Sequence, residues 1–126
     1  MDMLEKYKVV AKRYEELLLK REDVIGIMHL GGIARKRADE DSDIDIAVFS
    51  YEPLKNIKLG EQFSEEGYDV ELFNIAINEG YDYWDPIMKE AYEEGFISTD
   101  KTGEVTDFMK KALEYKDDFR IHYLAK

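Results

Sequence analysis

The chain contains no cysteine and only two prolines among its 126 residues. Without cysteine it can form neither disulfides nor thiolate metal sites, so a bound metal would need oxygen or nitrogen ligands. The longest uncharged apolar run, residues 24–34, is far shorter than the roughly 20 residues of a membrane-spanning helix. The N-terminus lacks the basic-then-apolar pattern of a secretion signal, and we expect a cytoplasmic protein.

Basic charge is also scarce. The chain has 18 Lys and Arg against 29 Asp and Glu, which gives a net charge of −11. Because broad nucleic-acid binding depends on neutralising phosphates with Lys and Arg, this balance argues against it. A small metal-bound nucleotide remains compatible, since local charge decides that contact, and residues 35–37 are all basic. The length fits one domain, residues 1–126, with a single core.

Two short patterns stand close together in the first half of the chain. Gly31 and Gly32 end one apolar run, and Asp43 and Asp45 flank a single isoleucine at the start of the next. On a strand the two aspartates point the same way, opposite Ile44. Like charges this close resist joint ionisation unless a cation lies between them, which favours Mg²⁺ or Mn²⁺. Glycines, which lack Cβ, let backbone N–H groups approach a phosphate closely.

Other acidic or phosphate-binding motifs fit this segment less well. An EF-hand calcium loop starting at Asp39 needs glycine at position 44 and glutamate at position 50, where the chain has Ile44 and Ser50. The Gly-Lys-Ser/Thr ending of a Walker loop and the dinucleotide-binding fingerprint are both absent. Asp-x-Asp also occurs in metal-dependent glycosyltransferases, whose domains are generally much longer. A solvated acidic turn before an ordinary strand is the remaining alternative.

These motifs resemble the nucleotidyltransferase superfamily that includes DNA polymerase β, and within it the minimal nucleotidyltransferases of prokaryotes. The family pattern is a glycine turn, an Asp-x-Asp strand and a third carboxylate on a later strand. The matching segments are Gly31-Gly32, Ala34-Arg35, residues 42–46 and residues 68–73. The resemblance covers roughly residues 24–75. The chain departs from the pattern at Gly32, where serine is usual, and at Lys36, where glycine is common.

The resemblance implies a site and an activity. Two Mg²⁺ or Mn²⁺ ions would be held by Asp43, Asp45 and Asp69, with Glu71 as the alternative third ligand, and phosphates would be bound by Gly31, Gly32, Arg35 and Ser42. The protein would move a nucleoside monophosphate, AMP from ATP, to a hydroxyl and release pyrophosphate. For minimal members the acceptor is a protein, as in antitoxins that AMPylate a HEPN-type toxin; a homo-oligomer would also fit. The competing hypothesis is a non-catalytic nucleotide-binding antitoxin or scaffold that only binds its partner.

Hydrophobic periodicity predicts an α/β fold in which helices cover a small sheet, and the resemblance implies that the sheet is mixed. The expected order is α-β-β-α-β-α-α. The helices are expected from residue 4 to about 21, over 55–66, over 85–94 and after Gly103, and the strands over 24–30, 43–49 and 68–75. This order brings the three acidic positions close to strand ends of one sheet.

The remaining candidate residues are expected to be structural. His29 lies within the first expected strand and is interpreted as a packed or hydrogen-bonded histidine, and His122 as a surface residue. Tyr81, Tyr83 and Trp84 could stack on a base, but core packing or a partner surface is the favoured interpretation. Aromatic residues of the C-terminal third would form a protein-binding patch if several are exposed. They are Tyr92, Phe96, Tyr115, Phe119 and Tyr123.

Overall fold

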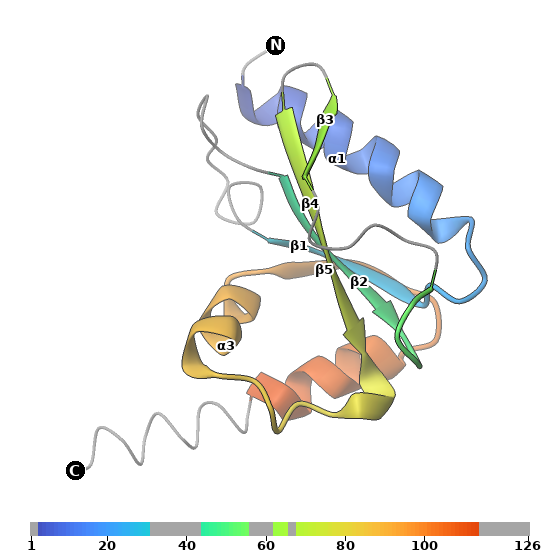
Figure 1. The fold of residues 1–126 in the computed structure, drawn as a ribbon, viewed down its shortest axis with the longest axis vertical. Coiled ribbons are helices and arrows are strands. Elements are labelled where there is room, and N and C mark those ends of the chain that lie inside the picture. Colours follow the sequence, from blue (N-terminus) through green and yellow to red (C-terminus); the bar gives the residue numbers. More distant parts are fainter. Residues whose placement is uncertain (1–2, 31–43, 56–61, 66–67, 114–126) are drawn as a thin grey trace.

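The computed structural model describes residues 3–30, 44–55, 62–65 and 68–113 (Figure 1). Their strands form one five-stranded sheet in the order β3-β4-β2-β1-β5. The strands are β1 (Gly26–Leu30), β2 (Ile44–Ser50), β3 (Gln62–Glu65), β4 (Tyr68–Ala76) and β5 (Phe96–Asp100). β2 and β4 are parallel and the other neighbours are antiparallel. The mixed α/β fold expected from the sequence is confirmed.

Helix α1 (Met3–Leu19) covers one face of this sheet. Its apolar residues recur at helical spacing, so Tyr7, Val10 and Leu18 are buried against the sheet. They pack with Val24, which precedes β1, and with strand residues of mainly β-branched type: Ile27, Ile44, Ile46, Val48, Val70 and Leu72. We call this group the α1-side cluster.

The opposite face is covered by α3 (Pro86–Glu93) and by a helical segment over residues 104–113, which follows β5 and is drawn orange-red in Figure 1. This second cluster is richer in aromatic residues and methionine: its buried members include Met28, Phe49, Ile75, Trp84, Tyr92 and Met109. At the start of α3 the Asp85 carboxylate accepts a hydrogen bond from the Met88 N–H at 2.8 Å, and Pro86 occupies the first turn. This is the pairing that favours a helix start.

Strand β2 shows how alternation divides its side chains between the two clusters. Ile44, Ile46 and Val48 belong to the α1-side cluster, whereas Ala47 and Phe49 belong to the second cluster. The sequence-based expectation for this strand is therefore confirmed, and it places position 45 on the face opposite α1.

Two expectations about the secondary structure were wrong. The helix expected over residues 55–66 is replaced in its described part by β3, which pairs antiparallel with the start of β4. In this tetrapeptide, pairing with β4 overrides the local helix propensity. β5 was not expected, although Ile97 and Thr99 are β-branched and lie between Gly95 and Gly103. The helices predicted near residues 4–21 and 85–94 are confirmed, with α1 ending at Leu19.

Candidate active site

The acidic site is organised by three neighbouring strands. β1 ends at Leu30, whose partner in the antiparallel register is Asp45 of β2. On its other side Asp45 is in parallel register with Glu71 of β4. Adjacent strands lie about 4.8 Å apart, and register partners share a face. Asp45 and Glu71 are therefore neighbours on the sheet, and both side chains are half-buried.

Both carboxylates lie on the face that carries the second cluster. The residues flanking Glu71 in the chain, Val70 and Leu72, are buried in the α1-side cluster, as are those flanking Asp45. Successive side chains of a strand point to opposite faces, so Asp45 and Glu71 project away from α1. The sheet therefore places two negative charges together on one face, at the end where β1 finishes.

Most of the other predicted site residues lie outside the described residues: Gly31, Gly32, Arg35, Ser42 and Asp43. The chain leaves β1 one residue before Gly31, beside Asp45. Asp69 belongs to β4, where its backbone is in register with Ser64 of β3. The three-carboxylate metal site remains a prediction.

The chemistry of the described carboxylates fits a hard divalent cation. Two adjacent, half-buried carboxylates repel each other, and a cation between them removes that repulsion while using the oxygen ligands that Mg²⁺ prefers. Within the described residues, no group of three or more His, Asp or Glu side chains is placed to hold a metal ion. Asp45 and Glu71 thus form part of a ligand set at most, and a third carboxylate would have to complete it.

His29 has a structural role, as expected. It is 5% exposed, its Nε2 lies 3.4 Å from Glu15 Oε1 of α1, and its ring lies 5.2 Å from that of Phe96. The hydroxyl of Ser98 in β5 donates to the same Glu15 oxygen. Burial lowers the pKa of His29, and the Glu15 charge opposes this only in part. The cluster ties α1 to β1 and β5 on the face opposite Asp45.

The aromatic residues considered for base stacking are divided between the core and the surface. Trp84 is buried in the second cluster, with its ring centroid 4.7 Å from that of Tyr92 and 5.7 Å from that of Phe108. Tyr81 packs against the same cluster, whereas Tyr83 is 56% exposed. Burial raises the pKa of Tyr92 to about 12, so its phenol stays neutral. The interpretation as core residues therefore holds for Trp84 and Tyr81.

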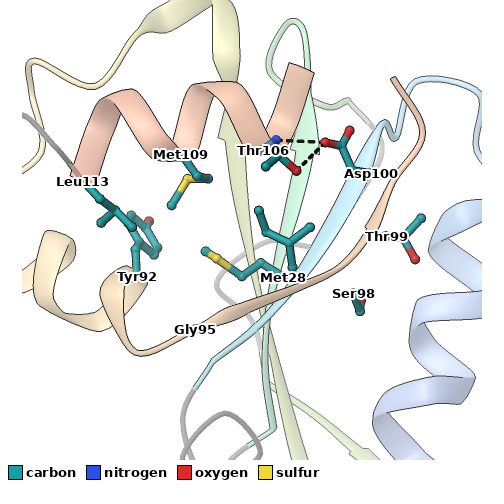
Figure 2. Close-up of a pocket in the computed structure, with 10 residues that line it drawn as sticks. Met28, Tyr92, Gly95, Ser98, Thr99, Asp100, Thr106, Met109 and Leu113 are labelled. Atoms are coloured by element: carbon teal, nitrogen blue, oxygen red, sulfur yellow. Dashed lines mark hydrogen bonds between the residues drawn. The ribbon is translucent and has the colours of Figure 1, made fainter. Parts of the chain in front are cut away.

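Sequence reasoning missed a hollow between β5 and the helical segment 104–113 (Figure 2). Its volume is about 430 Å³. Apolar and polar groups share its walls, with Met28 at the floor, Tyr92 and Leu113 at one end and Thr106 and Asp100 at the other. No local pattern in the sequence predicts this hollow, because it depends on how an edge strand and a distant helix pack. It lies on the same side of the sheet as Asp45 and Glu71.

Comparison with known proteins agrees with this fold. A family model described as a nucleotidyltransferase domain matches residues 11–125. The chain is also 30% identical, over 99 residues, to each of two Methanocaldococcus jannaschii proteins with the provisional name protein adenylyltransferase, MJ1217 and MJ0126. Each match covers 77% of this chain and 98% of the relative. The chain belongs to the nucleotidyltransferase domain family.

The family defines the general activity, which is the transfer of a nucleoside monophosphate from a nucleoside triphosphate. The resemblance of Gly31-Gly32 and the Asp-x-Asp strand to the minimal nucleotidyltransferases is therefore confirmed. None of the described helices is both long and apolar enough to cross a membrane.

Proposed function

We propose that this nucleotidyltransferase moves AMP from ATP to a hydroxyl group of a protein, and that the reaction depends on divalent metal ions. The observation that carries the proposal is the register of β2 and β4, which puts Asp45 beside Glu71 next to the end of β1. The provisional names of the two relatives, which are both protein adenylyltransferases, support AMP as the transferred group and a protein as acceptor.

In the proposed reaction the acceptor oxygen forms a bond to the α-phosphorus of ATP. The bond from that phosphorus to the oxygen bridging to the β-phosphate breaks, pyrophosphate leaves and the hydroxyl loses its proton. Asp45, Asp43 and either Asp69 or Glu71 would hold two Mg²⁺ ions. Such ions stabilise the charge of the phosphates and lower the pKa of a bound hydroxyl. Gly31, Gly32, Arg35 and Ser42 would position the triphosphate.

The finer identity of the acceptor follows from the resemblance to minimal nucleotidyltransferases. It suggests a cytoplasmic partner protein of the HEPN toxin type, with this chain acting as its antitoxin. The alternative is a protein of the same fold that binds nucleotide and partner without transfer. Gly32 favours that alternative, because a serine at this position would add a hydroxyl contact to phosphate.

A transfer assay separates the two functions. The purified protein is incubated with magnesium, ATP labelled at its α-phosphate and a cell lysate, and label that survives a denaturing gel is measured. Asp45→Asn should lose the label, whereas Asp82→Asn, which changes an exposed aspartate in the loop before α3, should keep it. Binding of Mg-ATP with no covalent label on any acceptor would establish the non-catalytic function, and full labelling in EDTA would refute metal dependence.

The third carboxylate is tested by two further variants. We propose Asp69 as the third metal ligand, because it lies between two apolar residues, as the third acid of the family usually does. Glu71 would then be a supporting residue close by. Asp69→Asn should abolish transfer and retain much of the Mg-ATP affinity, since the third acid serves the attacking hydroxyl more than the triphosphate. The register of Glu71 with Asp45 is the observation that supports the other assignment. An inactive Glu71→Gln together with an active Asp69→Asn would establish it.

A further inference from the structure

The outer edge of β5 faces no other strand in the part of the chain that the structure describes. Among the described residues β5 is the outermost strand, paired only with β1. Sheet edges are usually protected by proline, lysine or inward charges, and residues 96–99 of β5 include none of these. The lysine that follows the strand, Lys101, is turned aside, since its Nζ donates to the carbonyls of Leu19 and Arg21 at 3.0 and 3.2 Å. Phe96, the first residue of β5, is 46% exposed.

A hollow accompanies this edge. The space of about 430 Å³ beneath the helical segment 104–113 is lined by β5 itself and by Met28, Ile97, Met109 and Leu113 (Figure 2). A strand edge beside a partly apolar hollow is a combination used when an extended peptide adds to a sheet. The backbone supplies hydrogen bonds, and a pocket selects one side chain.

The charges around β5 indicate which peptide would fit. Glu93 and Glu94 are exposed just before the strand, and Asp100 ends it. The Asp100 carboxylate accepts hydrogen bonds from the Thr106 N–H and hydroxyl at 2.9 and 2.7 Å. Burial raises its pKa, but these bonds and others from Gly103 and Thr102 outweigh it and hold the pKa below the ordinary value. With a net charge of −11, the chain favours a basic partner.

The edge also leads toward the acidic site. Phe96 is in register with His29, and the next residue of β1, Leu30, is the partner of Asp45. At about 4.8 Å between strands, the line of β5 lies roughly 10 Å from that of β2. Gly95, which precedes β5, lies against the end of β1, since a Cβ there would lie 2.6 Å from Leu30 Cδ2. A peptide added outside β5 lies one strand further out, roughly 14 Å from β2, so the residues that follow its docked part would have to cross the ends of β5 and β1 to reach Asp45.

We propose that the β5 edge and the adjoining hollow are the docking site for the acceptor protein. An extended basic segment of that protein adds to β5 as a further strand, inserts one apolar side chain into the hollow and presents a hydroxyl of the residues that follow it to the acidic end of the sheet. The role of the segment as acceptor depends on the proposed function, whereas its binding to β5 does not.

The test uses a synthetic peptide of about eight residues, long enough to span the five residues of β5 and extend past Phe96, in which valine alternates with lysine around one tyrosine. Binding is measured by fluorescence anisotropy without ATP or metal. We expect a Kd below about 1 mM for the unmodified protein. A peptide of the same sequence with every backbone nitrogen methylated keeps its side chains but loses the N–H donors of both edges, so it should bind roughly tenfold more weakly.

A variant of the hollow completes the test. Leu113→Arg places a cation in the hollow and should weaken peptide binding roughly tenfold, because it fills the apolar space and repels lysine. The matched control is Leu17→Arg, at a residue of α1 on the opposite face that is 59% exposed, and it should change the Kd by less than about twofold. Thermal melting checks that both variants fold.

Three results would overturn the proposal: no peptide binding to the unmodified protein, equal binding of the methylated peptide, or equal binding to a folded Leu113→Arg protein. The first two need no variant. With a protein acceptor, Leu113→Arg should raise the acceptor KM and leave Mg-ATP affinity unchanged. Peptide binding without any nucleotide transfer would preserve the docking site and refute the enzymatic function alone.

Discussion

The two faces of the sheet have different compositions and different tasks. The α1 side is filled mainly by aliphatic, mostly β-branched residues, and in its polar group the Glu15 carboxylate accepts from Ser98 and lies 3.4 Å from His29 Nε2. The opposite side has aromatic residues and methionine, together with Asp45, Glu71 and the hollow beside β5. The α1 side therefore stabilises the sheet. The opposite side retains the charges and the space that catalysis and binding need.

The comparison shows how a strand separates stability from function. In β2, Ile46 is fully buried on the α1 side, and its neighbour Asp45 is half-buried on the other. Alternation lets adjacent residues serve these two purposes without interfering with each other. Substitutions on the two faces should therefore have separable effects on folding and on activity.

The largest effect is expected on the rate of nucleotide transfer, when Asp45 is changed. Asp45→Asn should reduce nucleotide transfer by roughly 100-fold or more, because a metal ligand supplies several kcal/mol of transition-state stabilisation. Removing one of two adjacent like charges should leave stability unchanged or slightly higher without metal. Initial transfer rates and thermal melting measure the two quantities. Transfer within a few-fold of normal would show that β2 does not carry the metal site.

At the next residue, Ile46, we expect a loss of stability without a loss of activity. Ile46→Ala removes a fully buried side chain from the α1-side cluster and should lower the free energy of unfolding by about 2–5 kcal/mol. Transfer per folded molecule should remain normal. Urea unfolding measures the loss, and Ile87→Ala, at a residue that is 78% exposed on α3, is the control for a change without a cavity. Equal stability of the two variants would contradict the division between faces.

A smaller effect is expected where β5 meets the helical segment 104–113. The Asp100 carboxylate accepts from the N–H groups of Gly103 and Thr106 at 2.8 and 2.9 Å, so Asp100→Ala should cost about 1–2 kcal/mol. Because its pKa is held below the ordinary value, this contribution is present at neutral pH and disappears as pH falls through the native pKa. Asp107→Ala, an exposed site on the same helical segment, is the control in urea unfolding.

The smallest effect is expected for His29, on the α1 side of the sheet. Its pKa is lowered in the folded protein by burial, against an ordinary value of 6.5, while Glu15 acts in the other direction. Below about pH 6.5 the unfolded chain therefore binds more protons than the folded one, and stability should fall as pH decreases. Urea unfolding at about pH 7.5 and 5.5 should show a smaller loss for His29→Phe than for the unmodified chain. The same pH dependence in both proteins would refute this role.

Much of the fold could be read from local patterns. Helical spacing in α1, the Asp85 and Pro86 start of α3 and the alternation of β2 each depend on residues close in sequence, and each is confirmed. β3 and β5 could not be placed in the same way. Short strands of four and five residues carry little periodicity, and what makes them strands is the neighbour with which they pair.

The candidate site, too, could be predicted from the sequence only in part. The sequence by itself determined the family, through a glycine turn and paired aspartates at a fixed spacing, and it determined which face of β2 carries Asp45. The tertiary structure alone decided that Glu71 lies in register with Asp45 and that β5, the outermost described strand, adjoins a hollow. Spacing within one segment is fixed by covalent geometry, whereas register and edges arise when distant segments pack and form hydrogen bonds.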